Sequence, residues 1–225
     1  MRTAIGRQLH NSRRNLVIAS VVGIFAVAAD LVLVRWWNYY PLSIDARWAI
    51  ALMAIGVYLH LVNGDAASIG LMAIPAQGWS YWARMTLLIG LAVASCIVVA
   101  LGGWALAGRK LPVYAAPPSA IATSFLRMCV FSPLLEEATY RLVLCVPLAV
   151  LLRPWGAIVT SGLVFGGLHV VYGIPSPENL VGGFFLAWAF LKSETIYVPL
   201  LLHGLGNLCV LAFQVGVWYW LGTPS

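Results

Sequence analysis

Long apolar runs alternate with short polar segments along the chain. Apolar runs occupy residues 16–34, 48–62, 85–107, 119–152, 155–171, 180–191 and 196–220. Since a helix needs roughly 20 residues to cross a bilayer, these runs predict about seven spans. The range is six to eight, because the second and sixth runs are short and Pro133 interrupts the fourth, where it could split one helix into two or kink it. We therefore expect an all-α, polytopic transmembrane bundle.

Composition and charge agree with this expectation. The chain is 62% hydrophobic and only 9% charged, whereas soluble domains carry about 25% charged residues. The net charge of +6 is explained by basic residues that flank the spans and fix their orientation. The expected environment is the lipid bilayer, and no nucleic-acid partner is predicted.

Basic residues before the first run predict its orientation. Four arginines precede the run, which by the positive-inside rule places the N-terminus in the cytoplasm: Arg2, Arg7, Arg13 and Arg14. A cleaved signal peptide is the alternative, but the apolar run continues past Asp30 to Val34, as expected of a full span. Asp30 and Arg35, near the end of that run, are interpreted as residues at the membrane interface.

A proline-bearing stretch, residues 108–119, gives the best internal boundary. It contains Pro112, Pro117 and Pro118, and the ionisable residues that helix ends do not explain follow it. We interpret the chain as one membrane domain, 1–225, with supporting spans in 1–118 and an active core in 119–210.

The core carries polar residues inside apolar runs. They are Glu136, Glu137, Arg141, His169, His203 and Asn207. An ionisable side chain at the bilayer centre costs about 2.5–3.5 kcal/mol on insertion scales, so such residues usually face a cavity and have a function. Counted along helices at ~1.5 Å per residue, Glu136, His169, His203 and Asn207 reach similar depths, which predicts a membrane-embedded polar cavity.

The motif EEATYR predicts different roles for its two glutamates. On a helix, Glu137 and Arg141 lie at i and i+4, in the favourable order for an ion pair. Glu136 points about 100° away, and without a cation it suits a general base or acid. The alternative is a charge network that only fixes helix packing.

Two histidine motifs follow. His169, in FGGLH, comes one turn after Phe165, and Gly166 and Gly167 would let a neighbouring helix approach closely; alternatively His169 only bonds a backbone carbonyl. His203 and Asn207, in HGLGN, share one helical face. They suit a donor pair for an oxyanion, a metal ligand with an orienting neighbour, or a polar packing contact.

The three motifs in this order resemble the CPBP family of intramembrane proteases (Abi-like), which includes CAAX prenyl endopeptidases and bacteriocin-processing enzymes. The motifs are EExxxR (Glu136, Glu137, Arg141), FxxxH (Phe165, His169) and HxxxN (His203, Asn207). The resemblance covers about 119–210 and extends to VPLLLHGLGN and VGGFFLAWAF. The N-terminal spans show nothing specific.

The resemblance implies a helical bundle that hydrolyses a peptide bond in a membrane-anchored protein or peptide, in a bacterial inner membrane. Glu136 and His169 would activate a water molecule, His203 and Asn207 would stabilise the oxyanion, and Glu137 with Arg141 would support the site. We favour a metal-free glutamic mechanism without a cofactor. A zinc ion held by Glu136, His169 and His203 is the alternative, although no HExxH occurs.

Two other functions compete with the protease. A non-catalytic scaffold or immunity protein could keep the same fold. A proton-coupled transporter could use intramembrane Glu and His residues as a relay, but the two halves of the chain show no inverted repeat.

Overall fold

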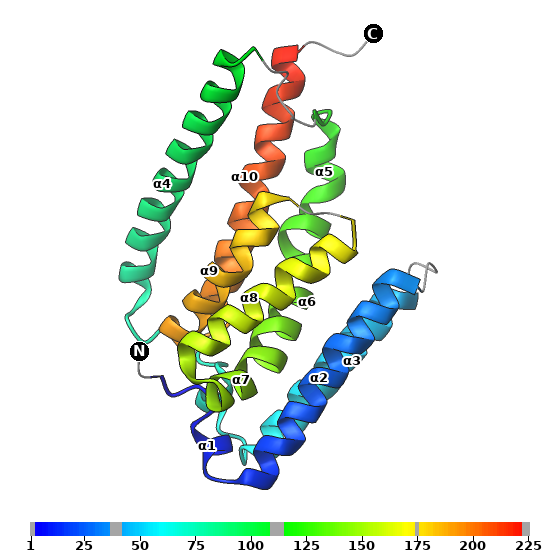
Figure 1. Cartoon of the computed structure of the whole chain (residues 1–225), viewed down its shortest axis with the longest axis vertical. Helices are drawn as coiled ribbons and strands as arrows, with labels where there is room; N and C mark the ends of the chain where they lie inside the picture. Colours follow the sequence, from blue (N-terminus) through cyan, green and yellow to red (C-terminus); the bar gives the residue numbers. More distant parts are fainter. Residues whose placement is uncertain (1–2, 37–41, 109–114, 174–175, 222–225) are drawn as a thin grey trace. The chain divides into compact units, whose positions relative to one another are not determined.

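The computed structural model describes residues 3–36, 42–108, 115–173 and 176–221, so Arg2 and Pro112 lie outside the described residues. In chain order the elements are α1 (Arg7–His10), α2 (Arg13–Trp36), α3 (Leu42–Leu61), η1 (Ala66–Ile69), α4 (Trp79–Leu106), α5 (Ser119–Phe125), η2 (Leu126–Phe131), α6 (Ser132–Glu137), η3 (Ala138–Cys145), α7 (Val146–Leu151), α8 (Arg153–Val171), α9 (Pro177–Ser193) and α10 (Tyr197–Leu221) (Figure 1). Within these ranges the only β contact is an isolated bridge between Leu71 and Thr195. The all-α prediction is confirmed.

Five of the described helices are long and apolar enough to cross a membrane: α2, α3, α4, α8 and α10. The predicted run at 180–191 falls in α9, which has 17 residues. The run at 119–152 is divided among five shorter helical segments. The expected number of seven spans therefore stays a prediction.

Pro133 does not break the helix that contains it. The chain is helical without interruption from Ser119 to Leu151, and wider π-helical segments, η2 and η3, precede Pro133 and Pro147. Proline lacks an N–H group and its ring crowds the carbonyl four residues earlier, and a π segment is one way for a helix to absorb such an interruption. For Pro147 that carbonyl belongs to Val143, and the buried Tyr58 hydroxyl donates to it over 2.6 Å.

The chain divides into two compact units. The first comprises Met1–Ala76 and Ser132–His203, and the second comprises Gln77–Phe131 and Gly204–Ser225. The predicted boundary after residue 118 stays a prediction, and part of the proline-bearing stretch lies outside the described residues.

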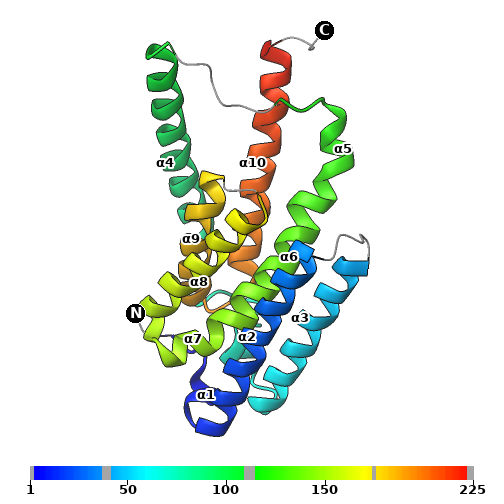
Figure 2. The same cartoon turned by 45° about the vertical axis from the view of Figure 1, so that its right-hand side comes forward.

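The first unit is built around η3. The helices α2 and α3 lie side by side (Figures 1 and 2) and both contact η3, which also packs on α8. The central residues of η3 are fully or almost fully buried, among them Arg141 and Val143. The motif with the paired glutamates therefore enters the most enclosed part of this unit.

Glycines set the close approach of α8 and α9. A Cβ atom at Gly162 would meet the Phe184 ring at 2.5 Å, and one at Gly183 would meet Phe165 at 2.9 Å. The prediction for the FGGLH glycines holds for Gly166, where a Cβ would lie 3.3 Å from the Leu180 backbone, but is wrong for Gly167, which faces open space. Small residues at such positions let helix backbones pack closely.

Candidate active site

Glu137 and Arg141 form the expected ion pair. Arg141 Nε lies 2.9 Å from Glu137 Oε2, and both side chains are completely buried. Arg141 Nη1 also donates to Ser161 Oγ over 2.9 Å, and its guanidinium lies 5.2 Å from the centre of the Phe165 ring. These partners from α8 hold Arg141 in place, so the pair ties η3 to α8.

His203 joins this pair from α10. Its Nδ1 lies 2.9 Å from Glu137 Oε1, so each carboxylate oxygen of Glu137 has a partner of its own. Because Glu137 is paired with a guanidinium, it accepts the hydrogen bond and Nδ1 of His203 carries the proton. Nε2 of His203 then points away from Glu137.

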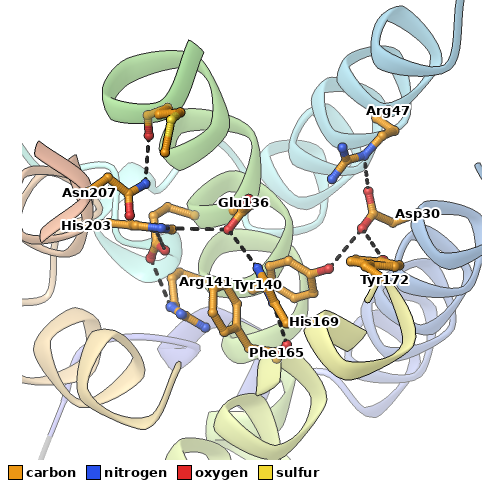
Figure 3. A network of polar contacts seen from close by, with 12 residues as sticks. Asp30, Arg47, Glu136, Tyr140, Arg141, Phe165, His169, Tyr172, His203 and Asn207 are labelled. Atoms are coloured by element: carbon orange, nitrogen blue, oxygen red, sulfur yellow. Dashed lines mark hydrogen bonds and ion pairs between the residues drawn. The ribbon is translucent and has the colours of Figure 1, made fainter. Parts of the chain in front are cut away.

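Glu136 lies between the two histidines (Figure 3). Its Oε2 atom is 3.8 Å from Nε2 of His169 and 3.8 Å from Nε2 of His203. This oxygen is buried and has no hydrogen-bond partner among the described residues. Of the two neighbouring glutamates, Glu137 has an arginine beside it and Glu136 faces two imidazoles.

The hydrogen bonds fix which ring nitrogen of each histidine faces Glu136. His169 Nδ1 lies 2.8 Å from the carbonyl of Phe165, and since a carbonyl only accepts, Nδ1 must donate. In their neutral forms both histidines therefore present an unprotonated Nε2 to Glu136. An ionised Glu136 adds a third acceptor, so a proton or a water molecule is needed to bridge the three groups. Such an arrangement suits proton transfer to and from water.

Phe165 is the packing centre of the site. Its ring lies 4.4 Å from that of His169, 5.3 Å from that of Tyr140 and 6.0 Å from that of His203, centre to centre. Because Gly183 leaves room for it, Phe165 fills the space beneath the polar groups. The FxxxH motif therefore supplies both an imidazole and its support.

A second polar network, missed in the sequence, adjoins the site. Asp30 is 2% exposed, so its side chain is enclosed within the protein, and its interpretation as a residue at the membrane interface stays a prediction. Its Oδ1 accepts from Arg47 Nε over 2.5 Å, and its Oδ2 accepts from the hydroxyls of Tyr140 and Tyr172 over 2.9 and 3.0 Å. The signal was present in the sequence, because four apolar residues follow Asp30 and place it a full turn inside the helix.

Both networks line one cavity of about 200 Å³. Its walls are formed by Val34, Arg47, Glu136, Tyr140, His169 and Tyr172. The cavity thus brings residues of α2 and α3 next to residues of the predicted core.

Asn207 belongs to the second unit. There its side-chain amide donates to the carbonyl of Met128 over 2.7 Å. One turn earlier on α10, Gly204 faces the carbonyl of Cys129, which a Cβ atom would approach to 2.6 Å. Asn207 therefore has a structural partner in η2, and its part in oxyanion binding stays a prediction.

The described residues do not form a metal site as they are placed. They contain no group of three or more His, Cys, Asp or Glu side chains arranged to hold a metal ion. Nδ1 of each histidine is occupied by a hydrogen bond, and zinc ligands would have to lie about 2.0–2.2 Å from one common point. Each histidine therefore offers only Nε2 as a possible metal ligand, and the alternative of a zinc ion held by Glu136, His169 and His203 stays a prediction.

Comparison with known proteins finds one family that resembles the segment carrying this site. Residues 118–209 match the family model described as type II CAAX prenyl endopeptidase Rce1-like. This segment of the chain is similar to the Rce1-like family. The match spans η3, α8, α9 and the part of α10 that carries His203 and Asn207, and it agrees with the family that the three motifs resemble. No curated protein matches the chain, and no solved structure does.

The match of residues 118–209 to the Rce1-like family supports a CAAX-type protease. Together with five apolar helices, it also supports an integral membrane protein whose substrate is associated with the membrane. Asp30 and Arg47 lie outside the matched segment, although Arg47 lines the same cavity as Glu136.

Proposed function

We propose that this protein is a glutamic-type intramembrane endopeptidase that hydrolyses a peptide bond in a membrane-anchored protein or peptide. The observation that carries the proposal is the position of Glu136 Oε2, which is buried, has no hydrogen-bond partner among the described residues and lies 3.8 Å from Nε2 of two histidines. A carboxylate and an imidazole that face each other across a cavity suit the activation of a water molecule.

In the proposed reaction, Glu136 and His169 remove a proton from water, and the water oxygen attacks the carbonyl carbon of the substrate. The carbonyl oxygen becomes an oxyanion, which His203 and Asn207 stabilise by donating hydrogen bonds. The C–N bond then breaks, and the proton held by Glu136 and His169 passes to the leaving amine.

Donation from His203 to an oxyanion requires a proton on Nε2 in addition to the one on Nδ1. The ring then carries a positive charge, and its contact with Glu137 Oε1 stabilises that charge. Glu137 thus supports the reaction without touching the substrate, because it orients His203 on one side and is held by Arg141 on the other.

The proposal also states the membrane and the orientation in which the protein acts. Substrate and enzyme would meet in a bacterial inner membrane, with the enzyme as a multi-pass protein whose N-terminus is cytoplasmic. The arginines before α2 and at its start support this orientation.

The test is cleavage of membrane-anchored peptides, prenylated and unprenylated, by the purified protein in liposomes. Wild type, Glu136→Gln and Glu137→Gln are compared, each with and without a strong zinc chelator. We expect Glu136→Gln to lower kcat by about 10²–10⁴-fold while the protein stays folded, and we expect wild-type cleavage to resist the chelator.

Glu137→Gln is the matched control, because it changes the neighbouring carboxylate by the same few atoms. It should weaken the Arg141 contact and lower stability as well as rate. Full cleavage by Glu136→Gln would contradict the assignment of the base, and chelator sensitivity that added zinc reverses would contradict the metal-free mechanism.

A further inference from the structure

The Asp30–Arg47 pair stands beside the proposed catalytic glutamate without being part of the family segment. Arg47 is the only cation among the described residues that line the cavity, and Glu136 lines the same cavity. Arg47 and Asp30 come from α3 and α2, outside residues 118–209.

Only one nitrogen of the Arg47 guanidinium has a hydrogen-bond partner among the described residues. Its Nε donates to Asp30 Oδ1, and its terminal nitrogens have no hydrogen-bond partner among the described residues. Its side chain is 17% exposed, compared with 3% for that of Asp30. In Figure 3 the free end of the guanidinium points toward the side of the network where Glu136 lies.

Asp30 itself is fully engaged. One oxygen accepts from Arg47 and the other accepts from the hydroxyls of Tyr140 and Tyr172. Tyr140 follows Glu136 by four residues and Tyr172 follows His169 by three, so Asp30 is held by the same two segments that carry the proposed base and its partner.

We propose that Asp30 is a positioning residue that keeps Arg47 from forming an ion pair with Glu136. This inference rests on the proposed function, in which Glu136 must stay free of a cation to exchange a proton with water. Opposite charges attract strongly in a cavity of low dielectric. An arginine released from Asp30 would therefore turn toward Glu136 and hold it in its ionised, paired form, as Arg141 holds Glu137.

The inference predicts an unusual pattern of rescue. Asp30→Asn should lower kcat at least about tenfold with little change in KM, because an ion pair with Glu136 removes the base but not the substrate-binding surface. Arg47→Gln should stay within about threefold of wild type. The double variant, Asp30→Asn with Arg47→Gln, should recover to within about threefold of Arg47→Gln, since no cation remains to pair with Glu136.

The chain offers a matched control for the change at Asp30. Asp65 pairs with Arg7 over 3.4 Å, where the Arg7 side chain is 63% exposed and neither residue lines the cavity. Asp65→Asn should leave kcat within about twofold of wild type, because exposed pairs contribute little.

A second measurement does not need activity. A hydrophobic carbodiimide modifies protonated carboxyl groups in apolar surroundings, and mass spectrometry of the peptide that contains Glu136 measures the extent. We expect the modification of Glu136 to fall several-fold in Asp30→Asn and to return in the double variant, because an ion pair with Arg47 disfavours the protonated form that reacts with the carbodiimide.

The outcomes separate this inference from the proposed function. A double variant as slow as Asp30→Asn, or equal modification of Glu136 in wild type and Asp30→Asn, would overturn it and leave Asp30 with a purely structural role. A large rise in KM in Arg47→Gln would also overturn it, since Arg47 would then contact substrate.

If Asp30→Asn does not fold, the double variant still tests the inference, because the inference requires the double variant to be active. Cleavage by Glu136→Gln would reject the proposed base, while the carbodiimide experiment would still report on Arg47.

Discussion

Two buried pairs of a carboxylate and an arginine lie close to the same cavity and differ in what surrounds them. Glu137 and Arg141 are both completely buried, and Ser161, His203 and the Phe165 ring occupy their remaining sides. Arg47 is only partly engaged by Asp30 and lines the cavity. The same chemistry thus serves a closed pair, which holds helices together, and an open pair, which shapes the charge of the cavity.

Breaking the closed pair should have the largest effect. Arg141→Met leaves the carboxylate of Glu137 buried without a cation, which in other proteins costs about 3–5 kcal/mol. We expect a loss of that size in the free energy of unfolding, measured by denaturant titration in detergent micelles, together with loss of cleavage.

The matching variant at the open pair gives the contrast. Arg47→Gln should cost less stability than Arg141→Met, because Tyr140 and Tyr172 still donate to Asp30. Equal losses in the two variants would show that the distinction between a closed and an open pair is wrong.

A glycine on α9 tests the closed pair from its packing side. In Gly183→Ala the new methyl group would lie 2.9 Å from Phe165 and 3.1 Å from the carbonyl of Gly162. Overpacking of this kind costs about 1–3 kcal/mol. Because Phe165 packs on His169, we also expect kcat to fall by about tenfold or more.

Gly182→Ala is the control, since a Cβ there meets no atom within 4 Å. It should leave the cleavage rate unchanged and keep or slightly raise stability, because alanine is the better helix residue by roughly 0.5–1 kcal/mol. A rate loss shared by both variants would point to the helix itself rather than to Phe165.

Single hydroxyl groups should give the smallest effects. Ser161→Ala removes one hydrogen bond from Arg141, and Tyr172→Phe removes one from Asp30. Hydrogen bonds to charged groups contribute about 1.5–3 kcal/mol, and the remaining partners reduce the loss, so we expect about 1–2 kcal/mol in unfolding titrations of each variant.

The rate of cleavage by Tyr172→Phe should change little, although Tyr172 lines the cavity. With Tyr172→Phe, Arg47 is still paired with Asp30, so kcat should stay within about threefold of wild type. A much larger loss of kcat in Tyr172→Phe would mean that its hydroxyl has a direct part in the reaction.

Local spacing made the closed pair predictable. Glu137 and Arg141 are four residues apart, and a single helical turn suffices to bring them together. The predicted convergence of Glu136, His169, His203 and Asn207 rested on their similar depths, and the family resemblance rested on the order of the motifs. Within the first unit, Glu136 Oε2 lies 3.8 Å from Nε2 of both histidines, whereas Asn207 belongs to the second unit.

The open pair was not predictable in this way. Asp30 and Arg47 are 17 residues apart on two helices, and Tyr140 is 110 residues from Asp30. Such contacts depend on how helices pack, and no local pattern encodes them. The π segments were also missed, because the sequence shows where a proline interrupts a helix but not how the backbone absorbs the interruption.

The π segment η3 makes the site depend on chain length as well as on residue type. Ala138–Cys145 holds extra backbone between the glutamates and Pro147, so the helical faces before and after it are out of phase. Removing one residue there, for example Thr139, would let the segment rewind as an ordinary helix, and it would leave Glu137 and Arg141 three residues apart instead of four. Because the closed pair depends on that spacing, a gap of one residue in this stretch would be a sharper sign of a non-functional relative than most substitutions.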